Sequence, residues 1–140
     1  MEYIVDKSIL FPLVDEEVSR VANETYSEDG TSLYDTIVIT ENDKPTIGRM
    51  MDDAVNTFVK RAQDIVRYEK GKLTFIRIPD FDESLTAPTE QEITRYIVLN
   101  TCAAWFQSRN RDKVEEFTLR GQTAMDKAIA YLKTIKHPTR

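Results

Sequence analysis

The sequence predicts a mainly α-helical fold, a bundle of about four helices with a small β element, in which the last two helices form an antiparallel hairpin. Three observations predict it. Apolar residues recur every three or four positions in four long segments. The 140 residues include only 4 Gly and 5 Pro, too few for a loop-rich or disordered chain. No linker divides residues 1–140, so we expect a single helical domain.

The first helix is expected over residues 10–25. Pro12 suits the first turn of a helix, where a missing N–H costs nothing. The acidic residues 15–17 then lie near the positive end of the helix dipole. Val18 and Val21, with Leu13 or Val14, give an apolar stripe. A polar turn or loop is expected at residues 27–32.

The middle of the chain is predicted to contain a second helix and a strand. Residues 36–40 are β-branched but too few for periodicity to separate a strand from the start of a kinked helix. A strongly amphipathic helix is expected over residues 45–69, ended by Gly71. Residues 73–78 are the best strand candidate, and Pro79 would stop the strand.

The third and fourth helices are expected to pair. Thr89 and Glu92 have the spacing of a capping box, so the third helix would begin there and end near residue 108. It is apolar on most sides, which is typical of a buried central helix. Asp112 and Glu115 repeat the capping pattern for a fourth helix that ends near residue 135.

A hairpin of these two helices follows from the very short connection at residues 110–112. Gly121 is expected to mark a close crossing of the fourth helix against the third. The side chains predicted to be buried in the hairpin are Ile97, Ala104, Trp105, Phe117, Met125 and Leu132.

Charge is distributed unevenly along the chain, whose net charge is −5. Before Gln107 there are 11 basic and 20 acidic residues, and from Gln107 onward 8 basic and 4 acidic. Such a molecule suits docking to a charged protein surface or to copies of itself, head to tail. The acidic body disfavours DNA binding. We expect no sequence-specific nucleic-acid binding, and no membrane span or signal peptide is visible.

No catalytic constellation is visible, so we predict no enzymatic activity, no metal and no cofactor. His137, the single histidine, lies beside Pro138 near the end of the sequence, where no long element would hold it rigidly. The alternative is an acidic metal site at Asp80, Asp82 and Glu83, but these residues lack the spacing and the glycine of an EF-hand. Cys102 is interpreted as a buried thiol, and no phosphate-binding glycine motif is present.

The C-terminal third resembles small structural proteins of tailed phages and prophages, of the head–tail connector (adaptor) type. The likeness lies in the apolar helix with Ala104-Trp105, the charged helix after it, and the closing His137-Pro138-Thr139-Arg140. Position 137 is His where the pattern has a basic residue. The likeness extends only loosely to the second helix and the strand after it.

The resemblance implies a virion protein, made in the host bacterial cytoplasm, that forms a ring beneath the portal in the phage neck. Its partners would be copies of itself, the portal and tail or neck proteins. Residues 133–140 would then be a basic docking tail, presented by Lys133, Lys136, His137, Pro138 and Arg140. The alternative is a small cytoplasmic protein-binding or regulatory module. The sequence leaves the ring stoichiometry, the virion neighbours and the position along the neck open.

Overall fold

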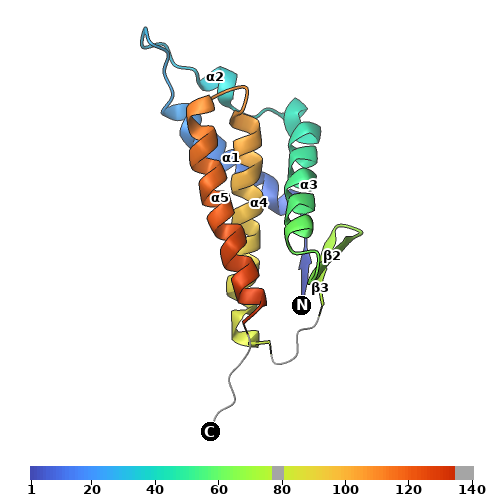
Figure 1. The fold of residues 1–140 in the computed structure, drawn as a ribbon. Coiled ribbons are helices and arrows are strands. Elements are labelled where there is room, and N and C mark those ends of the chain that lie inside the picture. Colours follow the sequence, from blue (N-terminus) through green and yellow to red (C-terminus); the bar gives the residue numbers. More distant parts are fainter. Residues whose placement is uncertain (77–80, 135–140) are drawn as a thin grey trace.

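Four long helices and a small sheet form the fold in the computed structural model, which describes residues 1–76 and 81–134. The predicted mainly α-helical bundle is confirmed. The helices are α1 (Lys7–Asn23), α3 (Lys44–Arg61), α4 (Thr86–Phe106) and α5 (Arg111–Leu132). Figure 1 shows α4 and α5 side by side along their length, with α3 beside them and α1 crossing behind. Within the described residues, no helix is long and apolar enough to cross a membrane.

The predicted antiparallel hairpin is formed by α4 and α5. A Cβ placed on Gly121 would lie 3.5 Å from the backbone nitrogen of Asn100, which confirms the close crossing. Of the hairpin residues predicted to be buried, all but Ala104 are buried. Ala104 is partly exposed because it lies one turn after Asn100, on the one stripe of this part of α4 that reaches the surface.

Helix α1 begins earlier than the sequence predicted. Asp6 is its N-cap, and the Asp6 carboxylate accepts a hydrogen bond of 3.0 Å from the Ser8 backbone N–H. Pro12 therefore lies inside the helix rather than in its first turn, and the acidic residues 15–17 lie at mid-helix, away from the helix N-terminus. The predicted stripe is confirmed, because Val14, Val18 and Val21 are buried.

Residues 36–40 form neither a strand nor part of a long helix. A short helix α2 (Tyr34–Ile37) ends at Val38, whose backbone is extended. A 3₁₀ turn η1 (Glu41–Asp43) then leads directly into α3. Ile37 and Ile39 are buried, so the β-branched run packs into the core without pairing with another strand.

The second helix predicted over residues 45–69 wrongly includes a strand at its end. Helix α3 ends at Arg61, because the chain forms strand β2 (Val66–Glu69), which pairs with β3 (Lys72–Phe75). Lys70 and Gly71 make the hairpin turn with φ values of 53° and 73°, the conformation of a two-residue type I′ turn. Gly71 therefore serves this turn and does not end a helix.

A third strand, which the sequence did not predict, completes an antiparallel sheet. Strand β1 (Glu2–Ile4) pairs with the other edge of β3, so the order is β1-β3-β2. Strand β3 lies within the predicted strand at residues 73–78, apart from its first residue, but residues 77–80, including Pro79, lie outside the described residues. The sheet lies beside the lower end of α3 (Figure 1).

Both predicted capping boxes of the hairpin are wrong. A 3₁₀ turn η2 (Glu83–Leu85) runs directly into α4, which begins three residues before Thr89. The Thr89 hydroxyl is buried and donates a 2.6 Å hydrogen bond to the Leu85 carbonyl one turn earlier. The N-cap of α5 is Asn110, so Asp112 lies within the first turn. Both helices therefore begin before the predicted capping residues.

Candidate docking groove

Trp105 belongs to the core and is not an exposed anchor for a partner. Its side chain is buried, and its indole N–H donates a 2.7 Å hydrogen bond to the Ile37 carbonyl at the end of α2. The Arg109 guanidinium carbon lies 3.4 Å from the centre of the indole ring. Trp105 therefore fixes α2 and residues 38–40 against α4.

The residues considered for catalysis or metal binding form no described site. Asp82 accepts hydrogen bonds from the Ser84 backbone N–H and hydroxyl, and so caps η2, while Glu83 is exposed. Asp80 and His137 lie outside the described residues. Among the residues that are described, no group of three or more His, Cys, Asp or Glu is placed to hold a metal ion. Burial raises the pKa of the Cys102 thiol to about 12.

Of the predicted docking tail, residues 133–140, the structure describes only residues 133 and 134. Lys133 is the C-cap of α5, and its side chain is exposed at the lower end of the hairpin. The other predicted docking residues, Lys136, His137, Pro138 and Arg140, lie outside the described residues.

A groove between α1, α4 and α5 is the best candidate for a functional surface. It has a volume of about 590 Å³. It is lined by Leu13, Glu16 and Glu17 of α1, by Gln91, Glu92, Thr94, Arg95, Val98 and Leu99 of α4, and by Arg120, Thr123, Ala124 and Lys127 of α5. We call this surface the α1–α4–α5 groove.

The two outer walls of the groove carry opposite charges. The α1 wall presents Glu16 and Glu17, and the α5 wall presents Arg120 and Lys127. Neither Arg120 nor Lys127 forms an ion pair with a carboxylate of the described residues. The basic wall therefore has charge available for an acidic partner.

The groove also contains a buried carboxylate with an unsatisfied oxygen. Glu92 is only 9% exposed, although it lines the groove. Its Oε1 lies 3.6 Å from Nη1 of the half-exposed Arg95, beyond ordinary hydrogen-bond distance. Its Oε2 is buried and accepts no hydrogen bond from any described residue. A buried acceptor without a donor is costly, so a partner that supplies a donor here would gain binding energy.

An exposed apolar stripe on α1 borders the groove. Ile9 is 63% exposed and Leu13 is 37% exposed, and Pro12 is exposed between them. The spacing of three and four places these residues on one side of the helix. Leu13 lines the groove, so the stripe gives its acidic wall an apolar border of the kind that marks protein contacts.

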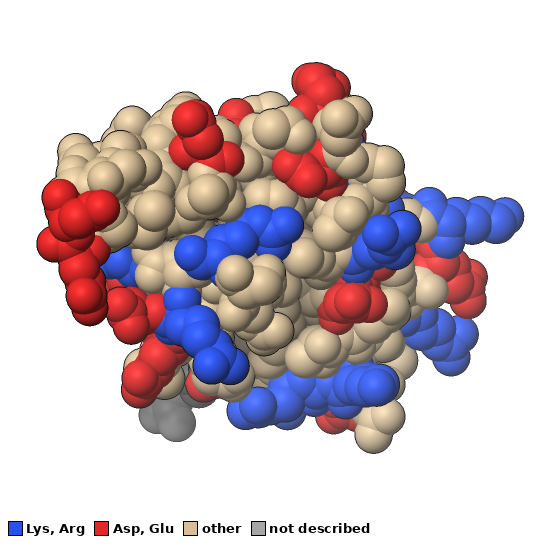
Figure 2. Space-filling view, turned by 90° about the horizontal axis from the view of Figure 1, so that it is seen from above, with Lys and Arg blue, Asp and Glu red and all other residues tan. Residues whose placement is uncertain are grey.

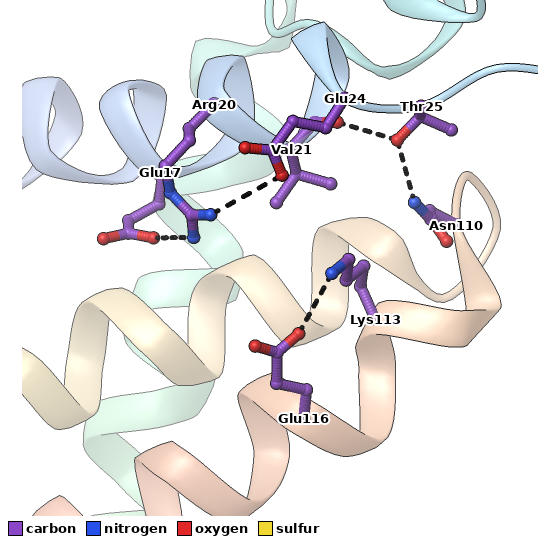
Figure 3. A network of polar contacts seen from close by, with 8 residues as sticks. All are labelled: Glu17, Arg20, Val21, Glu24, Thr25, Asn110, Lys113 and Glu116. Carbon is purple, nitrogen blue, oxygen red and sulfur yellow. Dashed lines mark hydrogen bonds and ion pairs between the residues drawn. The ribbon is translucent and has the colours of Figure 1, made fainter.

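A polar network fixes the upper end of α1 near the start of α5 (Figure 3). Arg20 forms ion pairs with Glu17 at 2.9 Å and with Glu24 at 3.9 Å. The Asn110 amide donates a 3.2 Å hydrogen bond to the hydroxyl of Thr25, which itself donates to the Val21 carbonyl. The Thr25–Asn110 bond joins the end of α1 to the α4–α5 connection, so α1 and the hairpin are linked at this end.

Charges of both signs also occur on the upper end of the bundle. Figure 2 shows acidic side chains along one edge and at the top of this view, with basic side chains across the middle and the lower right. No single sign covers this face. Recognition here is therefore better served by a partner with matching local charges than by a uniformly charged polymer.

Local patterns did not reveal this groove. Glu92 fits a capping box with Thr89, and Glu16 and Glu17 fit a helix N-terminus, so each residue has a sufficient local interpretation. A sequence feature that could have indicated the groove is Glu92 itself, a carboxylate in a helix that is otherwise apolar on most sides. No protein-family model, characterised protein or solved structure matches this chain.

Proposed function

We propose that this chain is a structural subunit of a ring in the neck of a tailed phage, acting as a head–tail connector (adaptor) between portal and tail. The observation that carries the proposal is the α1–α4–α5 groove with its oppositely charged walls and its apolar border. A subunit in a ring needs surfaces that receive a neighbouring copy. A groove of this character suits a protein segment better than a small metabolite, because its charges line an open surface.

The resemblance of the C-terminal third supports the placement in the neck. Helix α5 carries Lys133 to the lower end of the bundle, away from α2 (Figure 1). The docking tail, residues 133–140, would leave the bundle at this end and contact an acidic portal-type surface. The sides of the bundle would then contact neighbouring copies. The proposal assigns no catalysis and no cofactor to the chain.

The test is the composition and structure of particles purified from the source bacterium. Peptide mass spectrometry should find this chain in particles that contain portal and tail proteins. Image reconstruction should fit the helical bundle into a ring of density between portal and tail. Particles with a complete neck from which the chain is absent would contradict the proposal.

The docking tail has a separate test within the same experiment. A chain truncated after Ile135 should keep the helical content and the melting temperature of the full chain, because the described core ends before that residue. Its incorporation into particles should fall. Normal incorporation of the truncated chain would show that residues 136–140 are not needed for docking.

The alternative function is a small cytoplasmic protein-binding or regulatory module, whose partner would be a different protein. The two functions differ in where the chain is found. A regulatory module would be absent from purified particles and would remain monomeric at the concentrations at which a ring subunit assembles.

A further inference from the structure

The loop at residues 24–33, between α1 and α2, projects from the upper end of the molecule (Figure 1). We call it the finger. It is closed by an isolated bridge between Tyr26 and Ser32 and by a 2.8 Å hydrogen bond from the Ser27 N–H to the Thr31 carbonyl. Gly30 has a φ of 84°, which allows the tight turn at the tip. The finger is therefore a structured projection, ordered before any contact is made.

The tip of the finger is acidic. Glu28 is exposed beside Asp29. The Asp29 carboxylate accepts hydrogen bonds from the Ser27 hydroxyl and the Thr31 backbone N–H. These bonds lower the pKa of Asp29 to about 2, so this carboxylate is charged at neutral pH.

The finger also exposes an aromatic side chain. Tyr26 is 60% exposed, although a tyrosine ring offers a large apolar area for burial. The finger base is held by Thr25, whose hydroxyl accepts the hydrogen bond from Asn110 (Figure 3). An aromatic ring on a pre-ordered loop is an efficient contact residue, because little entropy is lost when it binds.

We propose that the finger of one copy docks into the α1–α4–α5 groove of a second copy, an inference that rests on the proposed ring. The Tyr26 ring would pack on Leu13 and Val98 of the neighbour. The Tyr26 hydroxyl would donate to the Glu92 carboxylate at the wall of the groove. Glu28 would face Lys127, which has no ion pair within the described residues.

The contact has a direction, because the finger and the groove are different surfaces of one chain. Such a head-to-tail contact repeats from copy to copy and closes into a ring when the rotation between copies allows it. A finger cannot fill the groove of its own copy at Lys127. That residue lies 16 residues after the start of α5, or about 24 Å along the helix from the end that carries the finger.

Engineered cysteines test the contact in the full chain. The native Cys102 is fully buried and does not compete for oxidation. A variant with Glu28→Cys and Lys127→Cys should form a ladder of disulfide-linked multimers on mild oxidation. The control, Glu28→Cys with Lys60→Cys, places the second thiol on the exposed side of α3. It should form few disulfide-linked multimers. Equal ladders, or no ladder in either variant, would overturn the inference.

A charge exchange gives an independent reading, with association measured by sedimentation velocity. Glu28→Lys and Lys127→Glu should each weaken association, by roughly tenfold for a close charge pair. The double variant should recover most of the loss, because the pair is restored in reverse. The control Lys60→Glu should associate like the wild type. Two single losses without recovery would contradict the pairing.

The outcomes separate this inference from the proposed function. If the chain forms a ring in particles but the cysteine ladder is absent, the finger contact is wrong and the neck function stands. If the ladder forms but purified particles lack the chain, the contact stands and the neck function is wrong.

Discussion

Helix α4 buries polar atoms in two regions. In one region these atoms have hydrogen-bond partners, and in the other one atom has none among the described residues. At its middle, the Tyr96 hydroxyl donates to the Ala54 carbonyl at 2.9 Å, and near its C-terminal end the Trp105 N–H donates to the Ile37 carbonyl. In the groove, one oxygen of Glu92 has no donor among the described residues. The first region joins α4 to α2 and α3, whereas the second faces an open surface. The difference indicates that one region is built for folding and the other for a partner.

An unsatisfied atom alone does not mark a docking surface. The Thr101 hydroxyl oxygen is also buried and without a partner among the described residues, but Thr101 does not line the groove. Glu92 differs because charged walls and the apolar stripe of α1 surround it. Thr101 is therefore a matched control for Glu92 on the same helix.

The largest effect is expected in the folding region. Trp105→Ala should lower the free energy of unfolding by about 3–5 kcal/mol, because it leaves a large cavity and removes the donor to Ile37. Urea denaturation of the purified chain measures the change. If the variant unfolds like the wild type but fails to assemble, Trp105 contacts a partner copy. The region around Trp105 would then serve docking and not folding.

Alkaline pH should weaken the same region. Burial raises the pKa of Tyr96 from 10.0 to about 12, so its stabilising effect is complete below pH 10. Between pH 10 and 12 the unfolded chain ionises while the folded chain does not, which lowers the free energy of unfolding by up to about 1.4 kcal/mol per pH unit. Cys102 acts in the same direction from pH 9 upward.

Tyr96→Phe isolates the contribution of the tyrosine. Denaturation at several pH values should show a shallower loss of stability above pH 10 in this variant than in the wild type. Parallel curves for the two proteins would show that Tyr96 ionises as readily in the folded chain as in the unfolded chain.

The sequence patterns were sufficient for the hairpin, because the helical period there extends over long segments joined by a short connection. They did not predict two strands of the sheet, β1 and β2. Ile65 and Val66 continue the apolar spacing of α3, and the Lys70-Gly71 turn lacks the usual Asn or Asp of a type I′ turn. Strand β1 has only three residues, too few to show an alternation.

The groove was beyond prediction for a different reason. It depends on α1 crossing the back of the α4–α5 hairpin, and this arrangement has no local signature. Glu92 becomes exceptional only when the structure shows that its Oε2 is buried and has no hydrogen-bond donor within residues 1–76 and 81–134. Local patterns assign that residue to a helix cap, where a glutamate needs no further explanation.

In the docking region, removal of the unsatisfied carboxylate should stabilise the fold and weaken association. Glu92→Met keeps the length of the side chain and removes the buried carboxylate, so the free energy of unfolding should rise by about 1–2 kcal/mol. Sedimentation velocity should show weaker association of copies. A loss of stability, or unchanged association, would contradict the role assigned to Glu92.

The smallest effect is expected for the control on the same helix. Thr101→Val removes a buried hydroxyl that has no described partner and keeps the side-chain shape, so stability should rise by about 0.5–1 kcal/mol. Association should be unchanged, because Thr101 does not line the groove. If Thr101→Val weakens association as much as Glu92→Met does, the groove has no special role.

Hydroxyl-radical footprinting of the full chain at increasing concentration tests the docking of copies most directly. Tyr26 and Leu13 are exposed in the single chain and should lose reactivity together as copies associate. Ile4 and Ile76 are also exposed but belong to the sheet region, so they should stay reactive. Protection of Tyr26 and Leu13 alone is the predicted result. Reactivity that does not change with concentration, or protection only of Ile4 and Ile76, would contradict the account.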